Sequence, residues 1–97
     1  MLGRWQAAGG PVLRIDGDSL CLATRDAEDC NLYERDLGGP GEDFAARLAA
    51  AKVATTGPLV EVWAGTALDL ALTRDGGLAL MEAYEPKAAP VVFRRIR

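Results

Sequence analysis

Leucines at every second position mark the segment between residues 68 and 80. Leucine occupies every second position from 68 to 72, the run stops at Arg74-Asp75-Gly76-Gly77, and leucine returns at positions 78 and 80. A period of two that is interrupted by Asp-Gly-Gly is typical of two antiparallel strands joined by a tight turn. We therefore predict a β-hairpin here, with its leucines on one face.

Similar patterns predict further strands along the chain. These strands cover residues 4–7, 12–15, 19–24, 31–37, 59–64 and 91–96, with turns at Asp16-Gly17-Asp18 and at residues 26–29. The last strand ends in a basic segment, Arg94-Arg95-Ile96-Arg97. We interpret that segment as a solvated strand at the edge of the sheet, where charge protects against aggregation.

Residues 42–53 follow a helical pattern. The segment is rich in alanine, begins with Glu42-Asp43, and carries Phe44, Leu48 and Ala51 on one stripe. We expect Gly57-Pro58 to close this segment. The predicted fold class is α+β and mainly β: an antiparallel sheet or small barrel of seven to eight short strands, with one helix at about residues 42–53.

Composition limits the class of protein. A chain of 97 residues is long enough for one modest core, so we expect residues 1–97 to form a single domain. The net charge of −3 comes from scattered charges, which disfavours nucleic-acid binding, and no apolar run is long enough to cross a bilayer. As given, we expect the chain to be soluble: periplasmic or envelope-located if a signal segment has been removed, and cytoplasmic otherwise.

The two cysteines, Cys21 and Cys30, enclose eight residues. Strands joined by a hairpin bring such a pair within reach of a disulfide. The alternative is two half-buried thiols, since Cys21 lies between two leucines, where free cysteine packs as a small apolar residue. Because disulfides are rare outside oxidising compartments, we favour the thiols.

Candidate chemistry is limited by the lack of any histidine in the chain. Carboxylates cluster in two predicted turns, where they suggest either a calcium site or an acid–base pair; these are Asp16, Asp18, Asp26, Glu28 and Asp29. We interpret them as solvated turn formers. The glycine-rich segment 38–41 lacks the lysine and hydroxyl residue of a phosphate loop. We therefore predict no catalytic, metal or cofactor-binding residue.

Two tryptophans and two arginines are candidates for an interaction surface. Trp5 and Trp63 would anchor a partner or line a ligand cavity if exposed, and Arg94 and Arg95 would contact an acidic partner. In a domain of this size tryptophan more often fills the core, and we favour that interpretation for both.

A series of landmarks resembles the META domain family. In order, they are Trp5, Pro11-Val12-Leu13-Arg14-Ile15, Asp29-Cys30-Asn31-Leu32-Tyr33, Glu42, Phe44, Leu48 and Leu70-Ala71-Leu72 before a glycine turn. Members of that family are small bacterial envelope domains of mixed β-sheet with one helix, often lipoproteins and linked to stress or drug tolerance. The resemblance implies an accessory role in the bacterial envelope.

A second resemblance is to calycin-type barrels similar to bacterial inhibitors of secreted metalloproteases. It rests on Gly3-Arg4-Trp5, on Trp63 seven residues before Leu70-Ala71-Leu72-Thr73, and on an arginine in the closing strand. The resemblance implies that this arginine packs over Trp5.

Together these features predict a non-enzymatic binding or accessory domain whose ligand is an unknown protein partner or small molecule. One alternative is an inhibitor or antagonist of a specific protein, which would form a tight stoichiometric complex. The other is a carboxylate-based enzyme, which would need two acidic groups that converge in a pocket, with at least one displaced pKa.

Overall fold

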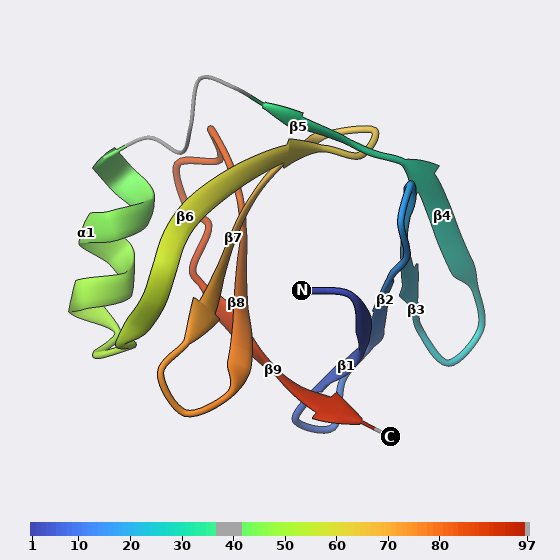
Figure 1. Cartoon of the computed structure of the whole chain (residues 1–97), viewed down its shortest axis with the longest axis horizontal. Helices are drawn as coiled ribbons and strands as arrows, with labels where there is room; N and C mark the ends of the chain where they lie inside the picture. Colours follow the sequence, from blue (N-terminus) through green and yellow to red (C-terminus); the bar gives the residue numbers. More distant parts are fainter. Residues whose placement is uncertain (37–41, 97) are drawn as a thin grey trace.

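The computed structural model describes residues 1–36 and 42–96 and shows an antiparallel sheet with one helix against it (Figure 1). The elements are β1 (Gly3–Ala7), β2 (Val12–Ile15), β3 (Ser19–Ala23), β4 (Glu28–Leu32), β5 (Glu34–Asp36), α1 (Glu42–Ala50), β6 (Thr55–Trp63), β7 (Ala67–Thr73), β8 (Gly77–Glu82) and β9 (Val91–Ile96). The order of strands in the sheet is β4-β3-β2-β1-β9-β8-β7-β6-β5. The predicted class, mainly β with one helix, is confirmed.

The sheet curls into a barrel-like shape (Figure 1). Pairing of β1 with β9 joins the N-terminal and C-terminal halves, while the two outermost strands, β4 and β5, follow one another in the chain with only Tyr33 between them. The backbone N–H of Tyr33 donates to the carbonyl of Asp18 at 3.0 Å, and its hydroxyl donates to the carbonyl of Asp16 at 2.9 Å. These bonds hold the bend where the chain passes from one end of the sheet to the other.

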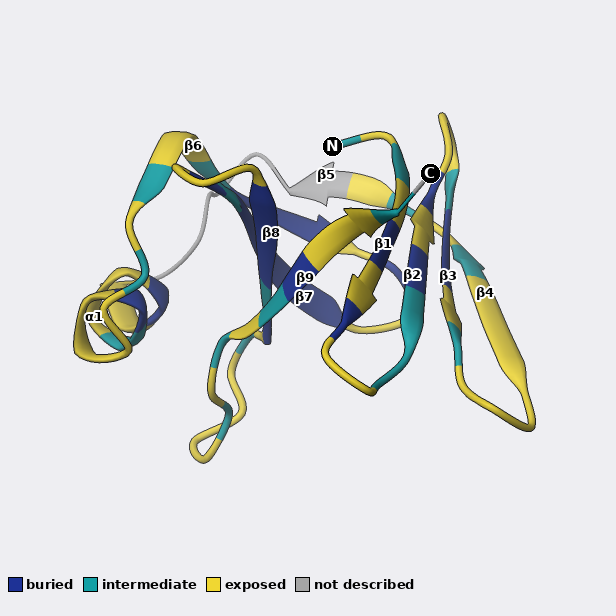
Figure 2. Ribbon diagram, turned by 90° about the horizontal axis from the view of Figure 1, so that it is seen from below, coloured by how far each residue is buried: buried dark blue, intermediate teal, exposed yellow. Residues whose placement is uncertain are grey.

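Two hydrophobic clusters lie on opposite faces of the sheet (Figure 2). The inner cluster fills the barrel and includes Trp5, Leu13 and Phe93. The outer cluster joins Phe44 and Leu48 of α1 to Ala71, Ala79 and Met81 of β7 and β8. The helix therefore covers the outer face of the sheet, and β7 is buried on both sides. No helix in the described parts of the chain has the length and apolar character that a bilayer span requires.

The hairpin of β7 and β8 forms as predicted. Leu70 pairs with Leu80 and Leu72 with Leu78 across the turn, so the leucines share the inner face. The interpretation of the C-terminal strand as an edge was wrong. β9 pairs with β8 on one side and with β1 on the other, because the N-terminal strands extend the sheet beyond β9.

Three predicted boundaries differ from the structure. Segment 31–37 contains parts of two strands, since the chain changes pairing partner at Tyr33, and residues 37–41, including the glycine-rich segment, lie outside the described residues. The helix ends at Ala50, before Lys52 adopts a left-handed φ of 58°. Gly57 and Pro58 lie within β6, where the register shifts between Thr56 and Val60, so they form a bulge and not a stop.

Candidate functional site

The outer face of the sheet carries one acidic side chain on β6 and one on β7. Glu61 and Asp69 are directly paired across these strands, and each is only 2% exposed. Along their strands they alternate with Val60, Val62 and Leu70, which point into the barrel, so the two acidic side chains point outward. Two carboxylates buried side by side are costly, so their surroundings are the natural place to look for function.

Glu61 and Asp69 lie in a cavity of about 470 Å³ between the first turn of α1, the sheet and the chain that follows β8. We call this cavity the acidic pocket. Its lining residues are Glu42, Asp43, Phe44, Arg47, Glu61, Asp69, Met81, Ala83, Tyr84, Glu85 and Pro86. Five of these residues carry carboxylates, and one is basic. Its volume falls in the usual range of ligand sites, of about 300–1,000 Å³.

Burial raises the pKa of Asp69, and a hydrogen bond with the side chain of Glu61 offsets part of that rise. Among the described residues, the buried Oδ1 atom of Asp69 has no hydrogen-bond partner. The hydroxyl of Tyr84 donates to Oε1 of Glu61 at 3.3 Å. The pocket thus contains a hydrogen-bonded carboxylate pair, of which the buried Oδ1 atom of Asp69 has no partner among the described residues.

The one basic side chain of the pocket is occupied by backbone contacts. Arg47 donates to the carbonyl oxygens of Glu85 at 3.0 Å, Pro86 at 3.0 Å and Ala88 at 2.6 Å. These bonds fix the segment after β8 to the helix. Arg47 therefore shapes one wall of the pocket. Its bonds go to backbone carbonyls, so a positively charged ligand would still be attracted to the carboxylates of the pocket.

The pocket chemistry favours an organic cation over a metal ion. The described residues contain one group of three potential metal-ligating side chains (cysteine, aspartate or glutamate) with ligand atoms within 4.8 Å of one another. It consists of Cys21, Glu28 and Cys30. That group is not suited to bind a metal ion, because both cysteines are oxidised to a disulfide and provide no thiolate ligand. Glu61 and Asp69 form a pair without a third carboxylate at such distances, whereas calcium takes six to eight oxygen ligands.

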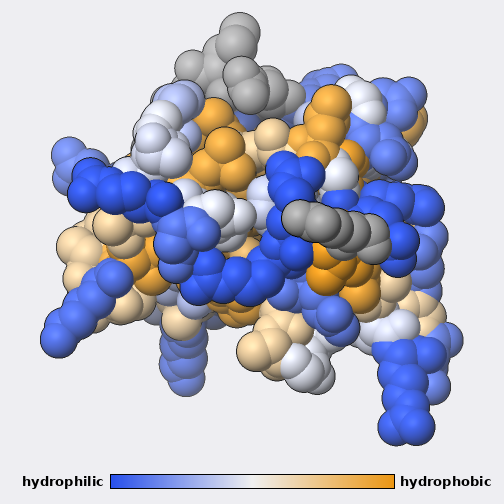
Figure 3. Space-filling view, turned by 60° about the horizontal axis from the view of Figure 1, so that its bottom comes forward, coloured by the Kyte–Doolittle hydropathy of each residue, from blue (hydrophilic) through white to orange (hydrophobic). Residues whose placement is uncertain are grey.

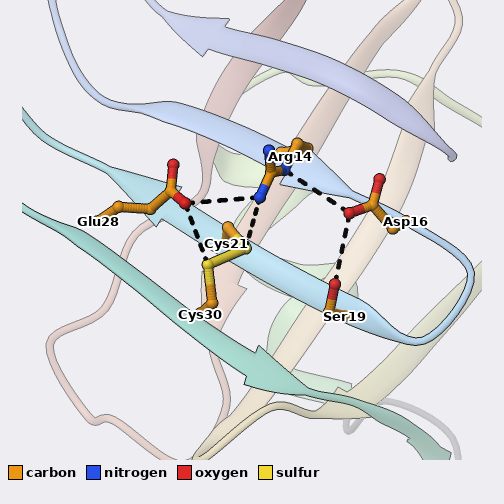
Figure 4. The surroundings of a disulfide bond; sticks show 6 residues. All are labelled: Arg14, Asp16, Ser19, Cys21, Glu28 and Cys30. Atoms are coloured by element: carbon orange, nitrogen blue, oxygen red, sulfur yellow. Dashed lines mark hydrogen bonds and ion pairs between the residues drawn. A yellow bond between two sulfur atoms is a disulfide. The ribbon is translucent and has the colours of Figure 1, made fainter.

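The structure joins Cys21 and Cys30 in a disulfide, so the favoured interpretation as free thiols was wrong (Figure 4). The two residues face one another across β3 and β4, which places their side chains on the same face of the sheet. Nη2 of Arg14 lies 3.4 Å from Sγ of Cys21 and 3.5 Å from Oε1 of Glu28. The disulfide links the outermost strand β4 to β3.

The predicted interaction residues do not form one surface. Trp5 is buried in the barrel with 1% exposure, and Arg95 packs over its ring at 4.2 Å, as the second resemblance implies. Trp63 is 57% exposed, so the expectation that it fills the core was wrong. Arg94 forms an ion pair with Asp75 at 2.8 Å. Arg94 belongs to β9, which is separated in the sheet from β6, the strand of Trp63, by β7 and β8. On the face shown in Figure 3, hydrophobic side chains form separate patches among hydrophilic ones.

The carboxylates that the sequence singled out are exposed. Asp16, Asp18 and Asp26 lie between strands, as expected, whereas the prediction of a turn at residues 26–29 was wrong for Glu28 and Asp29, which begin β4 and pair with β3. Arg14 lies 3.6 Å from Asp16 and 3.5 Å from Glu28. The pair that sequence reasoning missed, Glu61 and Asp69, had a recognisable signal. Each is the lone acidic residue of a largely apolar strand, and the apolar stripe of the helix required a sheet face to cover.

Comparison with protein-family models, curated proteins and solved structures gives no match for this chain. Function must therefore be argued from the pocket itself, and the resemblances to META domains and calycin-type barrels stay predictions.

Proposed function

We propose that this chain is a non-enzymatic binding domain whose ligand places a positively charged group in the acidic pocket. The observation that carries the proposal is that Asp69, a residue of the pocket lining, has a buried Oδ1 atom with no hydrogen-bond partner among the described residues. A buried acceptor without a partner costs about 1–3 kcal/mol, and more when it is charged. A cationic donor that enters the pocket would recover that free energy.

The arrangement of charge supports the same ligand. Asp69 and Glu61 lie at the buried base of the pocket, whereas Glu42, Asp43 and Glu85 are exposed residues of its lining. Exposed carboxylates attract a cation from solvent, and the buried ones bind it where water screens less. A rigid sheet and a helix fixed by Arg47 hold these groups in place without a ligand.

The experiment is a titration of the ¹⁵N-labelled protein with a panel of small ions, followed by amide chemical shifts. Ethylammonium, ethylguanidinium and calcium represent cations, and acetate and phosphate represent anions. We expect cations to shift the amides of Asp69, Met81 and Tyr84, and Asp69→Asn to weaken these shifts. Asp26→Asn, which removes an exposed turn carboxylate, is the matched control. Shifts confined to residues outside the pocket, or equal binding by both variants, would overturn the proposal.

A second candidate function is acid–base catalysis by Glu61 and Asp69. It is favoured by the raised pKa of Asp69 beside a second carboxylate, the arrangement that a carboxylate-based enzyme needs. The hydrogen bond between the two side chains places them closer than the separation of about 5–9.5 Å in most glycosidases. Turnover of glycoside, ester or peptide substrates that Asp69→Asn abolishes and Asp26→Asn retains would establish catalysis; retained turnover in Asp69→Asn would exclude it for this pair.

Inhibition of a partner protein is the same binding function with a macromolecular ligand. The exposed indole of Trp63 supports a contact with protein, because aromatic side chains contribute strongly to interfaces. A stoichiometric complex in size-exclusion chromatography that Trp63→Ala weakens would support this role. An unchanged complex would place the contact elsewhere.

A further inference from the structure

We infer that the positively charged group bound by the acidic pocket is a guanidinium, carried either by an arginine side chain or by a small guanidine compound. This inference rests on the proposed function and names the chemical class of its ligand. It is argued from the base, the walls and the electrostatics of the pocket.

The base of the pocket presents carboxylate oxygens from two adjacent strands. Asp69 and Glu61 are paired in the sheet, and both are 2% exposed. The side chain of Asp69 forms a hydrogen bond with that of Glu61. The Oδ1 atom of Asp69 nevertheless has no hydrogen-bond partner among the described residues. An unpaired acceptor that is buried beside a second carboxylate suits a donor group with several N–H bonds in one plane.

The walls of the pocket suit the aliphatic stem and flat head of an arginine. Phe44, Met81, Ala83 and Pro86 contribute apolar surface to the lining. Tyr84 adds an aromatic ring, which is 81% exposed and whose hydroxyl donates to Glu61 at 3.3 Å. A guanidinium stacks on such a ring while it donates to carboxylates.

The backbone of Tyr84 supports a functional role for its ring. Tyr84 has a φ of 64°, a left-handed conformation that is uncommon for residues other than glycine. Such conformations cost of order 1 kcal/mol or more and persist where the surrounding structure requires them. Here the conformation places the tyrosine between the end of β8 and the pocket, where its hydroxyl reaches Glu61.

The same features disfavour the competing cations. A lysine ammonium is compact and strongly hydrated, so its transfer into a buried site is costlier than that of a guanidinium. Calcium requires more converging oxygen ligands than Glu61 and Asp69 provide. The planar, weakly hydrated guanidinium matches a pocket with a carboxylate base, apolar walls and an aromatic ring.

The test compares ligands of matched size by amide shifts of the ¹⁵N-labelled protein at constant ionic strength. We expect ethylguanidinium to bind about threefold or more tightly than ethylammonium, because its planar donors pair with both carboxylates. Calcium should bind more weakly than either. Tyr84→Ala should reduce the preference for guanidinium, whereas Tyr84→Phe keeps the ring and should retain most of it. Asp26→Asn should bind all three probes like the parent protein.

A second set of ligands separates the two sources of a guanidinium. A blocked Gly-Arg-Gly peptide represents an arginine of a protein partner, and a blocked Gly-Lys-Gly peptide is its control. If the arginine peptide binds as tightly as ethylguanidinium or more tightly, the ligand is a protein arginine. If ethylguanidinium binds and the peptide does not, the ligand is a small guanidine compound. Either result supports the inference.

Failure of the inference is distinct from failure of the proposed function. Equal or tighter binding of ethylammonium or calcium at the pocket amides would overturn the guanidinium assignment and leave a cation-binding pocket. Binding of no cation at these amides would overturn both. Because Asp69→Asn changes a buried residue, Glu42→Gln at the exposed part of the lining serves as a second variant, and it should weaken ethylguanidinium binding without disturbing the core.

Discussion

Burial of the Asp69 carboxylate carries an electrostatic cost in the folded protein. Its pKa is raised in the folded protein by burial, so between the ordinary pKa of about 4 and the raised value the folded chain retains a proton that the unfolded chain has lost. The free energy of unfolding therefore falls as the pH rises through that interval and stays low above it. An ionised Asp69 reduces stability at neutral pH.

We predict that Asp69→Asn raises the free energy of unfolding at neutral pH by about 1 kcal/mol, because the amide has no charge to desolvate. It should also flatten the pH dependence above the ordinary pKa of aspartate. Urea unfolding at a series of pH values measures both effects, with Asp26→Asn as the control for loss of an exposed charge. A variant that is less stable than the parent and keeps the same pH slope would contradict this assignment.

The two tryptophans show that residue type alone does not predict burial. Both were expected in the core, yet Trp5 is buried and Trp63 is 57% exposed. The alternation that places Val60 and Val62 inside the barrel puts Trp63 outside it, and that alternation was visible in the sequence. Whether the helix would cover position 63 was not visible, because coverage depends on where a distant element packs.

At the scale of elements, the disulfide is the main support of strand β4. Among the described residues, this strand pairs with β3 alone, and most of its residues are exposed. The bond closes a loop with a sequence separation of 9 residues. We predict that the double variant Cys21→Ala and Cys30→Ala lowers the free energy of unfolding by about 2–3 kcal/mol, chiefly because the unfolded chain gains freedom.

Chemical unfolding of the double variant and of the parent, each with and without reductant, measures this contribution. Reductant should lower the midpoint of the parent and leave the variant unchanged. Hydrogen exchange should accelerate in β4 more than in β7, which is buried between its neighbours. Equal midpoints for the parent and the variant without reductant would contradict the prediction.

The β7–β8 hairpin depends on a close approach at Gly77. A Cβ atom at this position would lie 2.9 Å from the carbonyl oxygen of Phe93 and 2.9 Å from Oγ1 of Thr73. That same Oγ1 accepts the backbone N–H of Gly77 at 2.7 Å. We predict that Gly77→Ala lowers the free energy of unfolding by about 1–3 kcal/mol, as expected for overpacking.

Gly17→Ala is the matched control for this variant, because a Cβ atom there would meet nothing within 4 Å. Its stability should change by no more than about 0.5 kcal/mol. Thermal unfolding monitored by circular dichroism compares the two variants with the parent. A Gly77→Ala protein as stable as Gly17→Ala would show that β8 and β9 separate without cost.

Most strands were predictable because their signals are local. The leucine alternation and the Asp-Gly-Gly turn specified the β7–β8 hairpin, including its inner face. The errors occurred where long-range pairing decides the outcome. Three features follow from the pairing of strands, which has no local sequence signature. They are the division between β4 and β5 at Tyr33, the inclusion of Gly57 and Pro58 in β6, and the central place of β9.

At the scale of the whole molecule, the candidate site lies outside the barrel and not within it. The interior is filled by the inner cluster, and the apolar cavity of about 160 Å³ near Met1 and Leu2 is smaller than usual ligand sites. The acidic pocket instead uses the junction between helix and sheet. Its two buried acids escaped sequence analysis because strand alternation alone assigns them to a solvent-facing side, and only packing of α1 buries that side.

This placement makes cation binding dependent on pH in a defined direction. A cation binds the ionised form of Asp69, whose pKa is raised by burial, so binding must remove the proton that Asp69 retains at lower pH. We predict that the affinity for ethylguanidinium falls as the pH decreases through the raised pKa of Asp69 and reaches a plateau above it.

Amide-shift titrations from about pH 4 to pH 8 at constant ionic strength measure this dependence, since the range begins at the ordinary pKa of aspartate. Asp26→Asn should reproduce the parent curve, and Asp69→Asn should bind weakly with a shallower pH dependence. An affinity for ethylguanidinium that stays constant or increases towards low pH would contradict binding of the cation to the ionised carboxylate of Asp69.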